Sequence, residues 1–157
     1  MSVAIVAALW WCYFAGDDER AGLRMTEASS RRRSTLALTA FALDHYVMIL
    51  GLVLLAAGVR FVTGDVFAVA PAAGAWLLAF GVALYLVGDA RYRQELALGP
   101  ALIRYLAALV CAATGLIGLA VASLWQLLAL LIVLVVVIAG EAARAKSPTI
   151  PSIDPVS

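Results

Sequence analysis

Charged residues are scarce in this 157-residue sequence: Asp, Glu, Lys and Arg make up 13% of it, whereas hydrophobic residues make up 65%. Soluble domains carry about 25% charged residues, because their surfaces must be solvated. A chain this apolar cannot hide its side chains inside one small soluble core. The composition therefore excludes a soluble domain and predicts an integral membrane protein. The net charge of +1 also provides no general basic field for nucleic acid.

Histidine and cysteine are also rare, with one of the former and two of the latter. Cys12 and Cys111 lie in apolar runs without a His or a second Cys at ligand spacing. We interpret both as packing residues, because buried thiols behave as small hydrophobic groups. The sequence has no phosphate-binding loop and no paired nucleophile and base. We therefore expect a protein that is not an enzyme, with no catalytic residue, no cofactor and no metal.

The apolar residues are concentrated in long runs. About 20 helical residues, at ~1.5 Å each, cross a hydrocarbon core of ~30 Å. The predicted fold class is all-α: a polytopic helical transmembrane bundle of four full spans plus a short or truncated N-terminal helix. This single transmembrane domain covers residues 1–146, and residues 147–157 are predicted to form a disordered tail. The helices are predicted at about 2–15, 36–59, 71–88, 101–122 and 124–145.

The connections between these runs differ in character. The segment Gly16–Thr35 is rich in charge and is predicted to be a solvated loop. The apolar stretch from Ala101 to Ala139 is too long for one span, so we predict a turn at Ala122–Gln126. The first run, Ser2–Ala15, gives only ~21 Å of helix. This shortness leads us to expect the C-terminal portion of a larger protein.

Lys and Arg residues fall on one side of the predicted bundle. Alternating spans place ten of them on that side, and only Arg60 on the other. The positive-inside rule assigns the ten to the cytoplasm. We therefore expect a multi-pass protein of the cell (inner) membrane with a cytoplasmic C-terminus and an external N-terminus.

Asp44 and His45 lie within the predicted span 36–59, near the membrane midplane. An Asp at the centre of a helix costs ~2.5–3.5 kcal/mol on insertion scales, so the pair must face protein or water. One hypothesis is a proton or ion site, since imidazole titrates near neutral pH. The alternative is an interhelical clamp, in which both side chains form hydrogen bonds that hold helices together.

Small residues recur along three predicted spans. Helices in lipid associate through close contact, so stripes of glycine indicate the faces that pack against other helices. The span 124–145 is almost wholly bulky, and we expect it to lie at the periphery and face lipid. Trp10, Trp11, Tyr13 and Phe14 are predicted to form an interfacial aromatic belt. We name the following residues the packing glycines: Gly51, Gly58, Gly74, Gly81, Gly88, Gly115 and Gly118.

Three runs carry a resemblance to a known family. They are ALWWCYF at Ala8–Phe14, DHYVMILGLVLLAAG at Asp44–Gly58 and FGVALYLVGDARYR at Phe80–Arg93. Together they resemble the C-terminal half of the bacterial low temperature requirement protein A family. The resemblance implies a multi-pass membrane protein and a chain that is a truncated or split version of it. The family keeps an acidic residue directly after the aromatic run, whereas here two residues intervene before Asp17.

The family name records a growth phenotype and supplies no biochemical activity. Our leading hypothesis is a membrane protein that supports membrane function under cold or similar stress, through transport. The alternative is a structural or interaction module that pairs with another membrane subunit through exposed packing glycines. The expected partners are the lipid bilayer and either a missing N-terminal half, another membrane subunit or a homo-oligomer, and no nucleic acid.

Overall fold

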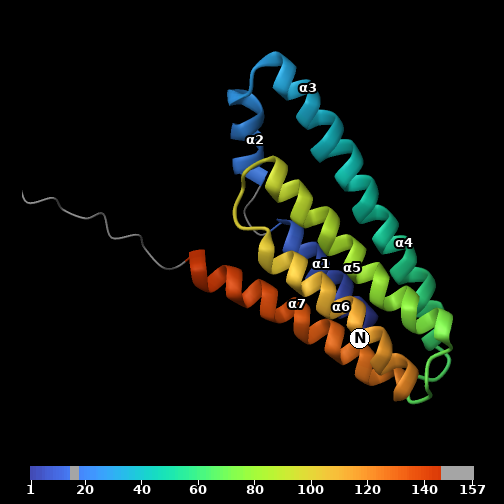
Figure 1. The fold of residues 1–157 in the computed structure, drawn as a ribbon. Helices are drawn as coiled ribbons and strands as arrows, with labels where there is room; N and C mark the ends of the chain where they lie inside the picture. The colour runs from blue at the N-terminus through green and yellow to red at the C-terminus, as the bar shows by residue number, and fades with distance from the viewer. Residues whose placement is uncertain (15–17, 146–157) are drawn as a thin grey trace, which may run out of the picture.

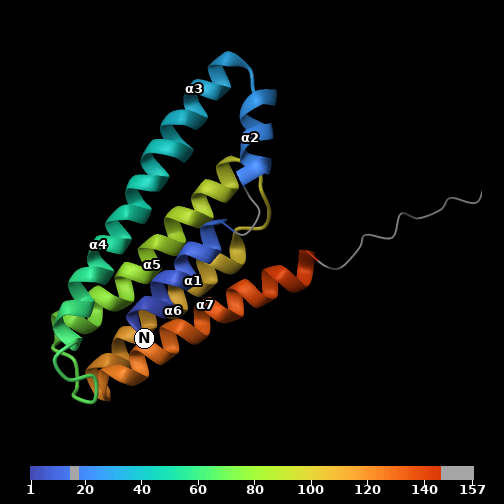
Figure 2. The same ribbon diagram turned by 180° about the vertical axis from the view of Figure 1, so that it is seen from behind.

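The computed structural model describes residues 1–14 and 18–145, and within them it consists of helices and one isolated β-bridge, between Val69 and Ala122. Figures 1 and 2 show an elongated bundle of helices. This architecture confirms the all-α class. In chain order the elements are α1 (Ser2–Phe14), α2 (Asp18–Glu27), α3 (Ser30–Leu38), the π-helix η1 (Thr39–Asp44), α4 (His45–Val62), α5 (Ala72–Glu95), α6 (Leu102–Ala120) and α7 (Ser123–Ala145).

Four helices within the described residues are long and apolar enough to cross a membrane. They are Ser30–Val62, Ala72–Glu95, Leu102–Ala120 and Ser123–Arg144. The N-terminal helix α1 is apolar but has only 13 residues. The prediction of four full spans plus a short N-terminal helix is therefore confirmed. The predicted tail at residues 147–157 lies outside the described residues.

The predicted solvated loop at Gly16–Thr35 is wrong, because α2 and α3 occupy most of it. The hydroxyl of Ser29 accepts from the backbone N–H of Arg32, which caps the start of α3. The guanidinium of Arg33 donates to three carbonyl oxygens at the end of α2 and just beyond it. Charged segments form helices when their terminal backbone groups are satisfied in this way. The second span consequently begins at Ser30, six residues before the predicted start.

The third span is also longer than predicted. Residues 71–88 were expected to be helical because the apolar run ends there, but α5 continues to Glu95. The two extra turns carry buried charges, Asp89 and Arg93. Charged residues continue a buried helix when they find partners on its neighbours, so hydropathy underestimates the length of such a helix.

The turn between α6 and α7 lies close to its predicted position, after Ala120 and before Ser123. It contains neither Gly nor Pro. The backbone N–H and the hydroxyl of Ser123 both donate to the carbonyl oxygen of Ala68, each at 2.9 Å. The turn is therefore held in place by hydrogen bonds to the loop between α4 and α5.

Each packing glycine lies against another part of the same chain. A Cβ added at Gly51 would lie 2.6 Å from the backbone nitrogen of Tyr85, and one at Gly81 would lie 2.5 Å from that of Leu55. The backbones of α4 and α5 are therefore in direct contact, which only glycine permits. Further along the chain, Gly58 faces Leu78, Gly74 faces Phe61, Gly88 faces Met48 and the carbonyl of Asp44, Gly115 faces Trp76, and Gly118 faces Gln126.

The last helix, α7, has two different faces. Leu127, Leu130 and Leu134 are buried in the main apolar core, whereas Ile132 and Val136 are exposed. The expectation of a peripheral, lipid-facing helix is therefore correct for one face only. Bulky leucines bury the other face, because α7 packs against α1 and α6 without the close backbone approach of α4 and α5.

Candidate functional site

Asp44 is fully buried at the end of η1. Its Oδ1 accepts a hydrogen bond from Nε of Arg91 on α5 at 2.9 Å. The side chain of Arg91 is 44% exposed, so this ion pair joins the interior of the protein to its surface. The second carboxylate oxygen, Oδ2, has no hydrogen-bond partner among the described residues. Asp44 is thus a buried carboxylate with one free oxygen and one partner at the surface.

His45 is the next residue in the sequence, and its side chain has different hydrogen-bond partners from that of Asp44. Its Nδ1 lies 2.9 Å from the carbonyl oxygen of Ala40, and its Nε2 lies 2.8 Å from the hydroxyl of Tyr13 on α1. A carbonyl oxygen only accepts, so Nδ1 donates to Ala40, and Nε2 shares the second hydrogen bond with the hydroxyl of Tyr13. Phe41 stacks on the imidazole, and Tyr13 and Tyr92 meet it edge-on. The imidazole is therefore enclosed by aromatic rings.

Tyr13 was expected to join an interfacial aromatic belt, and it instead points inward to His45. Its neighbours Trp10, Trp11 and Phe14 are exposed. The η1 segment, which carries Asp44, is a π-helix, and such wider turns occur often at functional sites.

The structure places Asp44 along the length of the bundle. In the structure Asp44 lies opposite Gly88 and Arg91, in the last two turns of α5, whereas Gly51 lies opposite Gly81 near the middle of that helix. Asp44 is therefore seven residues, or ~10 Å, from the middle of the bundle. Its depth in the membrane stays a prediction.

Sequence reasoning missed a second set of buried charges. Arg104, near the start of α6, is fully buried and forms ion pairs with Asp89 of α5 and Glu141 of α7. Its Nε and Nη2 donate to the two oxygens of Glu141 at 2.8 and 2.7 Å, a bidentate arrangement. Nη2 also donates to the carbonyl oxygen of Cys12 on α1 at 3.0 Å. One guanidinium thus links four helices.

These charges occupy one end of the bundle, and we name Asp44, Asp89, Arg91, Arg104 and Glu141 the charged layer. Asp44 pairs with Arg91, and Arg104 pairs with Asp89 and Glu141. Buried charges are tolerated only when they are paired and hydrogen-bonded, and the pairs here connect η1 with α5, and α5 with α6 and α7.

The sequence did contain signals for the missed residues. Asp89 and Arg93 are spaced four apart, which is the spacing of one helix face, but both lie beyond the end of the predicted helix 71–88. Arg104 is the only charge in the apolar stretch 101–139, and the count of Lys and Arg residues places it among the ten on the basic side. Glu141 was included in the last predicted helix without a role. An isolated charge inside an apolar run indicates a buried partner.

Two hydroxyl groups of the spans bind within their own helices. The hydroxyls of Thr39 and Thr114 donate to carbonyl oxygens of their own helices, those of Thr35 and Cys111. Cys12 and Cys111 are buried and free, and both belong to the main apolar core. Within residues 1–14 and 18–145, no group of three or more His, Cys, Asp or Glu side chains is placed to hold a metal ion.

Comparison with known families places these helices in context. The family model described as Bacterial low temperature requirement A protein (LtrA) matches residues 1–139. The chain belongs to this family. The match extends beyond the runs that carried the resemblance and includes α6 and most of α7. It also includes every residue of the charged layer except Glu141. No curated protein and no solved structure matches significantly.

Proposed function

We propose that this low temperature requirement A family member moves a proton or a small cation across the cell (inner) membrane, as a non-enzymatic protein. This movement would support membrane function under cold or similar stress. One observation carries the proposal: the buried carboxylate of Asp44 has a free oxygen and is paired with a half-exposed guanidinium.

Binding a proton or a cation stabilises a buried carboxylate that has only one partner, because an incompletely compensated charge is costly in a low dielectric. Arg91 supports such an exchange. Its side chain is 44% exposed, so it can leave Asp44 for the polar boundary without crossing the interior of the bundle. Asp44 would then be free to bind the transported ion.

His45 supplies the second exchangeable group beside Asp44. Its hydrogen bond to Tyr13 extends from α4 to α1, so a change in the charge of the imidazole would be transmitted to the N-terminal helix. The cluster around Arg104 has a different role in this proposal. Arg104 is fully buried and forms ion pairs with Asp89 and Glu141, so it holds the four helices in place while the Asp44 pair opens.

The proposal includes an orientation. The basic ends of α3, α5, α6 and α7 lie at one end of the bundle, and the loop after Arg60 lies at the other (Figure 1). We assign the basic end, with the C-terminus, to the cytoplasm. The proposed partners are the lipid bilayer and a further membrane segment, subunit or second copy.

The alternative is a purely structural or interaction module, with Asp44 as a clamp. Its expected contact surface was the set of packing glycines, but all seven of these residues face other parts of the same chain. A partner would have to bind the exposed bulky faces instead. Substitution of Asp44 distinguishes the clamp hypothesis from transport, because a clamp needs hydrogen bonds and transport needs an ionisable group.

The test uses the full chain reconstituted in liposomes that contain a pH-sensitive dye, with proton or potassium gradients. Asp44→Asn keeps the shape and a hydrogen-bonding group but cannot ionise. We expect this variant to remain folded and to lose the ion flux, whereas Asp44→Leu weakens the fold as well. Asp65→Asn is the control, because Asp65 is exposed in the loop between α4 and α5, and Asn keeps the side-chain oxygen that accepts from the backbone N–H of Phe67. A stable Asn variant with full flux, or a wild-type chain without flux, overturns the proposal.

A further inference from the structure

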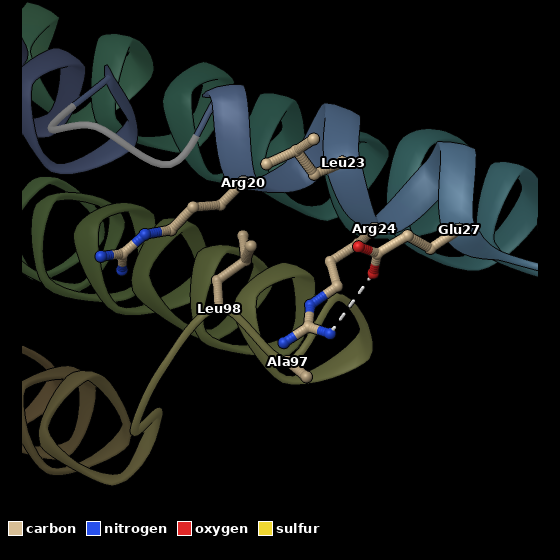
Figure 3. Close-up of a pocket in the computed structure, with 6 residues that line it drawn as sticks. All are labelled: Arg20, Leu23, Arg24, Glu27, Ala97 and Leu98. Atoms are coloured by element: carbon tan, nitrogen blue, oxygen red, sulfur yellow. Dashed lines mark ion pairs between the residues drawn. The ribbon is translucent and has the colours of Figure 1, made fainter.

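A pocket of about 350 Å³ lies outside the charged layer, between α2 and the connection from α5 to α6. We name it the α2 pocket. Figure 3 shows the guanidinium groups of Arg20 and Arg24 reaching from α2 to either side of Leu98. The lining residues are Arg20, Leu23, Arg24, Glu27, Ala97 and Leu98.

The α2 pocket is held by contacts on both of its sides. Ala21 of α2 is buried together with Leu96 and Leu98 in a second apolar cluster, which seats the helix on the connection after α5. The guanidinium of Arg33 donates to the carbonyl oxygens of Met25, Thr26 and Ala28, at 3.0 to 3.2 Å, and so fixes the far end of α2. The two arginines of the pocket are therefore presented by an anchored helix.

The lining combines two kinds of chemistry. Arg20 and Arg24 are four residues apart on α2, and their guanidinium groups line the pocket from opposite sides of Leu98, so an anion held over Leu98 lies between two cations. A guanidinium matches the geometry of phosphate oxygens with paired N–H donors. Leu23 and Leu98 add apolar surface beside these donors. A ligand that suits both parts is anionic at one point and apolar next to it.

The position of the α2 pocket indicates the source of such a ligand. The pocket adjoins the residues that follow Glu95, where the third span ends. The second span has 33 residues, or ~50 Å of helix, against a hydrocarbon core of ~30 Å, so its α3 portion extends beyond the core. Figures 1 and 2 show α2 lying beside this extension. The α2 pocket is thus at the level of the lipid headgroups.

We propose that the α2 pocket binds the phosphate of an anionic phospholipid headgroup, of the phosphatidylglycerol class. Arg20 and Arg24 bind the phosphate oxygens, and Leu23 and Leu98 contact the glycerol and upper acyl carbons. This site is separate from the charged layer and does not depend on ion movement there.

Glu27 is the carboxylate that competes with the lipid. Its Oε2 lies 3.8 Å from Nη1 of Arg24, and both side chains are more than half exposed. An exposed pair at this distance is weak, so a phosphate can displace it. Removing the charge of Glu27 should therefore strengthen lipid binding, because Arg24 is then released from its carboxylate partner.

The test is a titration of the detergent-solubilised full chain, followed by native mass spectrometry. The probes are short-chain phosphatidylglycerol, short-chain phosphatidylcholine and inorganic phosphate. We expect phosphatidylglycerol to bind most tightly. Arg20→Gln and Arg24→Gln should each weaken its binding about fivefold, and the double variant about 25-fold, since each basic residue near an anionic lipid contributes roughly a factor of five. Glu27→Gln should tighten binding.

Arg31→Gln is the matched control, because Arg31 is exposed at the start of α3 and lines no part of the α2 pocket. This variant should bind phosphatidylglycerol like the wild type, and thermal unfolding should show that all variants are equally folded. Three results overturn the proposal. Phosphatidylcholine binding as tightly as phosphatidylglycerol removes the requirement for an anion. An equal loss in Arg31→Gln indicates surface charge alone, and inorganic phosphate binding as tightly as the lipid indicates a soluble ligand.

Discussion

Nε of Arg91 donates to Oδ1 of Asp44 at 2.9 Å, across 47 positions of the sequence, and this contact joins a fully buried carboxylate to a half-exposed guanidinium. Arg91 lies in the last two turns of α5, and Asp44 lies opposite those turns at the end of η1. Gly88 of α5 contacts the backbone of Asp44 closely at the same place. The pair therefore closes the α4–α5 interface at the end where the other charges gather. Loss of this pair would leave the Asp44 carboxylate buried without a charged partner.

Replacing Arg91 with Gln should destabilise the bundle by about 1–3 kcal/mol, because Asp44 is left buried without its charged partner. The double variant Arg91→Gln with Asp44→Asn should recover most of this loss, since no buried charge then remains. Thermal unfolding of the four proteins in detergent, treated as a double-mutant cycle, measures the coupling. Additive effects of the two substitutions would show that the ion pair contributes nothing.

Replacing Arg104 with Met should have a larger effect, about 3–5 kcal/mol, because it strands two carboxylates, Asp89 and Glu141, in the interior. Arg104→Lys should rescue little of this loss, since an ammonium cannot bind both oxygens of Glu141 and the carbonyl of Cys12 in the same geometry. Thermal unfolding in detergent is again the measurement. Arg60→Gln, at the opposite end of the bundle, is the control and should unfold like the wild type.

Gly81→Ala should separate α4 from α5. The added Cβ would lie 2.5 Å from the backbone nitrogen of Leu55 and 2.8 Å from its Cα, and backbone atoms cannot move aside as a side chain can. Overpacking of this kind costs roughly 1–3 kcal/mol. The matched control is Gly140→Ala in α7, where nothing lies within 4 Å. There the higher helix propensity of alanine should raise the unfolding temperature, and a similar drop at both positions would refute the tight contact.

The proposed orientation can be checked with cysteines placed at the two ends of the bundle. Ser30→Cys, at the start of α3, should be protected from a membrane-impermeant thiol reagent in intact cells, and Thr63→Cys, after α4, should be labelled. The native cysteines are buried and should add little background. Labelling of the Ser30 variant from outside would reverse the assignment of the cytoplasmic side.

The sequence by itself determined that this is a helical membrane protein, where most spans lie, and which glycines recur along them. These features are local: hydropathy is summed over consecutive residues, and small side chains at seven-residue spacing fall on one helix face whatever their neighbours are. It also identified Asp44 and His45 as unusual, since each lies in an apolar run.

Only the tertiary structure decided what those residues bind. The partners of Asp44 and Arg104 lie on other helices, so no local pattern could select Arg91, Asp89 or Glu141. Because these charges are paired, α5 runs past the point where its apolar residues end, and Asp44 lies near one end of the bundle. The same reason applies to α2 and α3, whose ends are satisfied by Ser29 and Arg33. Hydropathy measures transfer of a free side chain, whereas folding buries a charge together with its partner.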